Sequence, residues 1–152
     1  MRLYHITQTP SPNTIAIATA AQAALHHYAP ETATVIMAQP TDFQADDLRN
    51  CDGLLLGTIE NIGALAGLTK DLFDRCYNDW LGHCDGLPVG IYIRAGLDGT
   101  ATSRTLTSYS KALGWRLIAP PLILHGTYDV SMTDDAADLA GRLAAGIDAG
   151  IF

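Results

Sequence analysis

Five short apolar runs, separated by longer segments of helical character, constrain the fold of this chain more than any other feature. The runs lie at residues 3–6, 32–38, 51–56, 87–93 and, within a longer stretch, 116–124. The third run is apolar almost throughout, as expected of a strand buried on both faces. Strands that alternate with helices form a parallel sheet covered on both sides.

The segments between and after these runs are typical of helices. Residues 13–28 are rich in alanine, and residues 65–80, 106–113 and 133–147 repeat apolar side chains every three or four positions. The first helix is expected to begin with Asn13 or Thr14 near its N-cap. Pro120 and Pro121 either interrupt the last strand or mark it as an edge strand.

Length, charge and cysteine content narrow the class of protein. The 152 residues fit one domain, residues 1–152, and 48% of them are hydrophobic. The net charge of −7 disfavours non-specific binding to nucleic acids and to anionic membranes. No apolar run approaches the roughly 18 residues that a transmembrane helix needs, and no signal peptide is evident, so we expect a cytoplasmic protein. Cys51, Cys76 and Cys84 are then expected to be reduced thiols, and no spacing supports a metal site.

The site is expected at one edge of the sheet. In doubly wound sheets, ligands bind beyond the carboxyl ends of the strands, where the winding direction reverses. The loop after the first strand, residues 7–14, offers hydroxyls, an amide and a helix N-terminus that can hold a phosphate, but it has no Lys or Arg. The alternative for this loop is a capped helix start after a proline-rich turn. The P-loop and G-x-G-x-x-G motifs are both absent.

Three motifs in chain order resemble those of the flavodoxin-like family. Residues 9–14, T-P-S-P-N-T, resemble the [ST]-x-T-G-N-T phosphate loop of flavodoxins. Residues 57–63, G-T-I-E-N-I-G, are similar to the G-T-P-x-x-x-G loop of quinone and flavin reductases with this fold. Residues 98–99, Asp-Gly, lie where the third flavin loop of the family lies. The resemblance covers the whole chain in element order and length.

The resemblance implies a flavodoxin-like, doubly wound five-stranded parallel sheet in the order 2-1-3-4-5, with helices on both faces. It also implies that FMN binds with its phosphate on the first loop and its isoalloxazine ring between the other two. No catalytic residue is indicated. The cofactor-binding residues that the resemblance implies are Thr9, Ser11, Asn13, Thr14, Thr58, Ile59, Glu60, Asn61, Arg94, Ala95, Gly96, Asp98 and Gly99.

The chain departs from the family pattern at several positions. Pro12 replaces the glycine of the phosphate loop and removes one backbone donor, and Ile59 replaces a proline. Neither ring loop carries the Trp or Tyr that stacks on the flavin in electron-transfer flavodoxins. An open ring face suits hydride transfer from a nicotinamide or access by a quinone.

Two charged residues have alternative roles. Arg94 either neutralises the negative charge that develops on the reduced ring or pairs with Asp98. Glu60 either lies near the ring, where its charge disfavours the reduced form, or points to solvent.

Three functions therefore remain open. The first is an FMN-dependent oxidoreductase that uses NADH or NADPH to reduce a quinone or a similar small-molecule acceptor. The second is a flavodoxin-type electron carrier that acts with a redox partner protein, and the third is an interaction module without flavin. The missing stacking aromatic favours the first, whereas the small size and acidic charge favour the second. No nucleic-acid or membrane partner is expected, and a homo-oligomer stays open.

Overall fold

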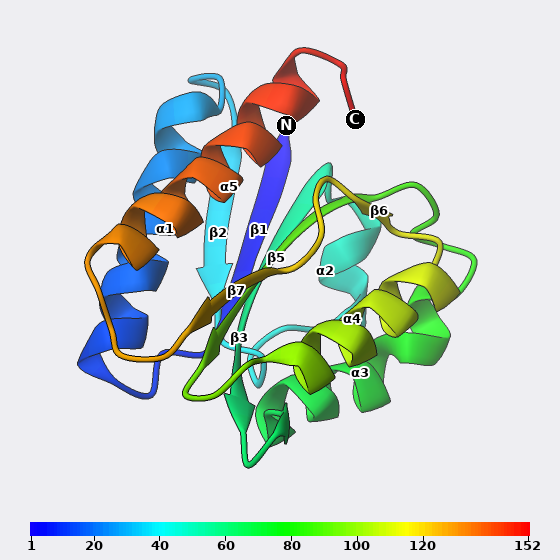
Figure 1. Cartoon of the computed structure of the whole chain (residues 1–152). Coiled ribbons are helices and arrows are strands. Elements are labelled where there is room, and N and C mark those ends of the chain that lie inside the picture. Colours follow the sequence, from blue (N-terminus) through cyan, green and yellow to red (C-terminus); the bar gives the residue numbers. More distant parts are fainter.

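The computed structural model describes residues 1–152, which form one seven-stranded sheet between two layers of helices (Figure 1). The main path of the sheet runs β2-β1-β3-β5-β6, and every pair along it is parallel. The expected fourth strand is β5, and the expected fifth strand corresponds to β6 and β7. The predicted order 2-1-3-4-5 is therefore confirmed. The strands are β1 (Arg2–Thr7), β2 (Thr34–Ala38), β3 (Gly53–Asn61), β4 (Ala64–Leu65), β5 (Pro88–Ala95), β6 (Arg116–Leu117) and β7 (Leu122–His125).

The fifth expected strand is split into β6 and β7, which both pair parallel with β5. Pro120 and Pro121 lie between the two pieces. They interrupt the strand because proline has no N–H with which to continue the ladder. Both expected consequences of these prolines, an interruption and an edge position, are present.

Helices cover both faces of the sheet. Figure 1 shows α1 and α5 side by side on one face, with α3 and α4 together on the other. The N-cap of the first helix is Ser11, a few positions before Asn13 and Thr14, which were expected near the cap, and Pro12 occupies the first helical position. The short helix α2 was not predicted, because five residues are too few to show a helical stripe. The helices are α1 (Pro12–Tyr28), α2 (Ala45–Arg49), α3 (Gly67–Trp80), α4 (Thr100–Ala112) and α5 (Ser131–Asp148).

The third strand is longer than expected. β3 continues to Asn61, turns at Ile62 and Gly63, and returns as the short antiparallel strand β4. The backbone stays extended there because residues 58–60 pair with residues 93–95 of β5. Helix α3 consequently begins at Gly67, a little later than the expected start.

Two hydrophobic clusters hold the layers together. One lies between the sheet and α3 and α4, and contains an aromatic group in which the Trp80 ring lies 5.8 Å from Phe73 and 5.6 Å from Trp115. The other lies under α1 and α5 and is built mainly from Ala and Leu side chains. Truncating one large buried side chain in such a core costs about 2–5 kcal/mol of stability.

The three cysteines are free thiols, and burial raises the pKa of Cys51 to about 12. No group of three or more His, Cys, Asp or Glu side chains is arranged to hold a metal ion. None of the helices is long and apolar enough to cross a membrane.

Candidate functional site

Loops from neighbouring strands meet at the carboxyl edge of the sheet. Thr7 pairs with Gly57, and Glu60 pairs with Ala95, so the segments that follow β1, β3 and β5 lie next to one another. The β3–β4 hairpin projects beyond the rest of this edge (Figure 1). The residues that the sequence predicts for cofactor binding are thus brought to the same edge.

The first loop is organised as a helix cap. Ser11 Oγ accepts a hydrogen bond from the Thr14 backbone N–H at 3.3 Å, and Thr14 Oγ1 accepts one from the Ser11 N–H at 3.0 Å. This reciprocal pair is a capping box. Thr9 Oγ1 accepts a hydrogen bond from Gln39 Nε2 at 3.1 Å, and Asn13 is exposed to solvent.

The hairpin is a strained and exposed part of this edge. Its two turn residues, Ile62 and Gly63, have φ angles of 53° and 70°. A positive φ is unusual for a β-branched residue, and the Ile62 side chain is fully exposed. The Thr58 side chain faces the opposite way: it is buried, and its Oγ1 lies 2.7 Å from Thr69 Oγ1 in α3. Any contact of Thr58 with a ring would therefore come from its backbone.

Glu60 connects the two predicted ring loops. Its carboxylate accepts hydrogen bonds from the Gly99 N–H at 3.1 Å, the Thr102 N–H at 3.2 Å and Thr102 Oγ1 at 2.9 Å. These donors belong to the first turn of α4, whose own N-cap, Gly99, has no side chain to cap it. The Glu60 side chain therefore does not point freely to solvent, because the start of α4 supplies the donors that a carboxylate needs.

Arg94 binds backbone rather than a carboxylate. Its guanidinium donates to the carbonyls of Leu124 at 3.0 Å and Gly126 at 2.6 Å, and to that of Ala95. The expected ion pair with Asp98 is absent. Asp98 instead accepts a hydrogen bond from the Thr100 N–H at 2.8 Å, and hydrogen bonds from Thr100 hold the pKa of Asp98 below its ordinary value. These hydrogen bonds from Arg94, which lies in β5, therefore hold the segment after β7 against β5.

A pocket of about 350 Å³ opens between the hairpin and the start of α4. The Glu60 carboxylate and the exposed Leu97 contribute to its wall. The complete lining is Glu60, Gly63, Leu97, Asp98, Thr100, Ala101 and Arg104.

A chain of buried polar groups lies beneath the site. A Cβ at Gly57 would overlap the Tyr92 hydroxyl and the Thr7 hydroxyl, which is why glycine is required there. The Tyr92 hydroxyl lies 2.8 Å from Thr7 Oγ1 and 2.9 Å from His5 Nε2. His5 Nδ1 lies 3.0 Å from Gln22 Oε1, which can only accept, so Nδ1 carries the proton and Nε2 accepts from Tyr92. Burial lowers the pKa of His5 to about 4.

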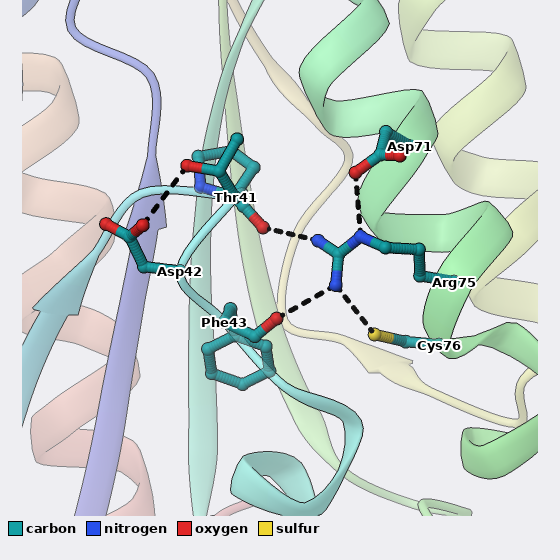
Figure 2. A network of polar contacts seen from close by, with 7 residues as sticks. Thr41, Asp42, Phe43, Asp71, Arg75 and Cys76 are labelled. Carbon is teal, nitrogen blue, oxygen red and sulfur yellow. Dashed lines mark hydrogen bonds and ion pairs between the residues drawn. The ribbon is translucent and has the colours of Figure 1, made fainter.

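The segment between β2 and α2 also reaches this edge, and no sequence pattern indicated its role. Figure 2 shows Arg75 of α3 reaching this segment, with Nη2 donating to the Pro40 carbonyl at 2.7 Å and Nη1 to the Phe43 carbonyl at 3.2 Å. Asp71 accepts from Arg75 Nε at 2.7 Å and orients the guanidinium. Arg75 therefore holds this segment in place, with Gln39 at its start bonded to the first loop.

These features define a doubly wound α/β protein whose loops converge at a topological switch point. No family model matches this sequence, and no curated protein matches it. Solved structures do match it across nearly their full length, and they show that the chain has the flavodoxin fold.

Three of these structures illustrate the likeness. A flavodoxin from the domain Archaea has a TM-score of 0.79 at 15% identity, with 97% of this chain and 99% of that chain covered. A cysteine-to-serine mutant of flavodoxin from Pseudomonas aeruginosa has a TM-score of 0.78 at 18% identity, with the same coverage of 97% and 99%. A WrbA-like flavodoxin protein from Agrobacterium tumefaciens has a TM-score of 0.74 at 15% identity, with 97% of each chain covered.

Proposed function

We propose that this chain binds FMN at the carboxyl edge of its sheet and acts as an oxidoreductase. The observation that carries the proposal is the Glu60 contact with α4, which holds the two predicted ring loops together around a pocket. The likeness to flavodoxins and to a WrbA-like protein supports the same ligand class.

FMN would contact this edge through both its ring and its phosphate. The backbone of residues 58–61 and of residues 95–99 would face the polar rim of the ring. The phosphate would lie over Thr9, Ser11, Asn13 and Thr14, where the N–H groups of Ser11 and Thr14 are used in the capping box. Bound FMN would accept a hydride from a nicotinamide and pass electrons to an acceptor, while the protein orients it and limits access to it.

We further propose that the reaction is the reduction of a quinone or a similar small acceptor by NADH or NADPH. The hairpin and the loop after β5 carry no Trp or Tyr, so no aromatic side chain of these segments can cover the ring. The side chains that do project there, Ile62 and Leu97, are exposed. A planar acceptor or a nicotinamide would therefore reach the ring directly.

A flavodoxin-type electron carrier is the second candidate. The net charge of −7 favours it, since electrostatic attraction accelerates association with a basic redox partner protein. The match to flavodoxins over nearly their whole length favours it as well.

Absorbance spectroscopy of the protein with added FMN separates these candidates. Anaerobic addition of NADH or NADPH should bleach the bound flavin rapidly if the chain is a reductase. No response to either nicotinamide, together with a long-lived half-reduced spectrum on stepwise chemical reduction, would instead identify a carrier. A protein that never retains FMN would refute both and leave an interaction module.

A further inference from the structure

The sheet is open at β2. This strand ends the path of the sheet and pairs with β1 alone. A hydrogen bond from the Thr34 N–H to the Met1 carbonyl, at 2.9 Å, fixes which backbone groups of β2 face β1. Because these groups alternate along a parallel strand, Thr34 and Ile36 direct their N–H and C=O groups at β1. Those of Val35 and Met37 consequently point outward, and no hydrogen bond within the chain uses them.

The sequence of β2 does nothing to prevent pairing at this edge. Natural edge strands avoid association through lysine, proline, bulges or a covering element. β2 has the sequence T-V-I-M-A, which contains no charged residue and no proline. The Met37 side chain is 50% exposed, and those of Val35 and Ile36 are half-buried. Both the backbone and the side chains of β2 are therefore suited to contact with another strand.

The surface beside β2 is depleted of charge as well. Asp, Glu, Lys and Arg make up 16% of the chain, yet Glu31 is the single such residue between Arg2 and Asp42. Helix α1, which lies beside β2 (Figure 1), falls within this stretch and exposes Ile15 and Thr19. Depletion of charge is typical of the core of a protein–protein interface. Two copies of a protein with a net charge of −7 repel each other overall, and this repulsion is weakest at an uncharged surface.

We propose that β2 is a homodimer interface, in which the β2 strands of two copies pair antiparallel about a two-fold axis at Ile36. This axis places Val35 of each copy opposite Met37 of the other, because a two-fold interface repeats every contact. Both residues direct their backbone groups outward, so each such pair exchanges both of its N–H···O bonds. The exposed Met37 side chain packs against Val35 of the second copy, and the two Ile36 side chains meet at the axis. A second copy fits this edge because the edge is complementary to itself.

Analytical ultracentrifugation over a series of protein concentrations that reaches millimolar tests the interface. The protein should change from monomer to dimer as the concentration rises. Met37→Lys places a charge opposite an apolar side chain and should raise the dimer dissociation constant by about tenfold or more. This change reduces the net negative charge, so overall repulsion between copies cannot explain a loss of association. Leu81→Lys is the matched control, because Leu81 is 48% exposed just after α3 and its substitution should leave the dimer intact.

Hydrogen exchange of individual amides tests the strand pairing itself. The amides of Val35 and Met37 should exchange slowly in the dimer and rapidly after dilution to the monomer. The Ile36 amide, which faces β1 in either state, should change little. A protein that stays monomeric over the whole concentration series would overturn the proposal, as would a dimer in which the Val35 and Met37 amides still exchange rapidly. A dimer that Met37→Lys leaves unchanged would overturn it too, because the contact would then lie elsewhere.

Discussion

Acidification should destabilise this fold through one buried side chain, His5. In the folded protein its ring is enclosed between Gln22 and Tyr92, and burial lowers its pKa from 6.5 to about 4. Protonation would place a second N–H opposite the Tyr92 hydroxyl, which now donates to Nε2 and accepts from Thr7. Protonation of His5 is therefore much less favourable in the folded state than in the unfolded chain.

The sign and size of the effect follow from these two pKa values. Above pH 6.5 neither state is protonated at His5, and stability is complete. As the pH falls from 6.5 to about 4, only the unfolded chain takes up the proton, so the free energy of unfolding decreases. At 1.36 kcal/mol per pH unit, the total loss is about 3 kcal/mol.

Denaturant unfolding at several pH values between 7 and 4 measures this loss. His5→Gln retains a polar side chain but cannot titrate in this range, so its stability should depend much less on pH. His27→Gln, which removes an exposed histidine instead, should behave like the unmodified protein. Parallel loss of stability in the unmodified protein and in His5→Gln would refute the reasoning.

Three further substitutions test features of the same edge. Ile62→Asn should raise the free energy of unfolding by about 1 kcal/mol, because Asn tolerates a positive φ in a hairpin turn; an unchanged unfolding midpoint would contradict this. Glu60→Gln should accelerate hydrogen exchange of the Thr102 amide, whereas Asp98→Asn should not; equal rates in both variants would remove Glu60 as the link to α4. Ser11→Ala should lower stability by about 1 kcal/mol in denaturant unfolding through loss of the cap; an unchanged unfolding midpoint would contradict the role of Ser11 as the cap.

Most of the fold could be predicted from the sequence, because buried strands and amphipathic helices leave simple patterns. The third apolar run identified the buried part of β3 correctly. Its continuation through Glu60 and Asn61 could not be predicted, since polar residues there stay extended only by pairing with β5 and β4. The hairpin turn could not be predicted either, because Ile62 is not a residue that favours this turn.

The position of the candidate site could also be predicted, but the direction of its side chains could not. Parallel topology alone places residues after β1, β3 and β5 at one edge. Glu60 reaches α4, and Arg94 reaches carbonyls after β7, through contacts between residues more than 25 positions apart. The partnership of His5 with Tyr92 spans 87 positions, and no local spacing signals it.

The two prolines that split the last strand also limit how copies of this chain can associate. An open strand edge offers a row of unpaired N–H and C=O groups to a strand of another chain. At the β6–β7 edge, Pro120 and Pro121 lack the N–H, and the two strands that flank them have only two and four residues. A second copy therefore cannot extend the sheet across this edge, and fibres built by repeated strand addition are blocked there. Assembly of this chain is therefore more readily joined through its helices, its loops or the other edge strands, β2 and β4.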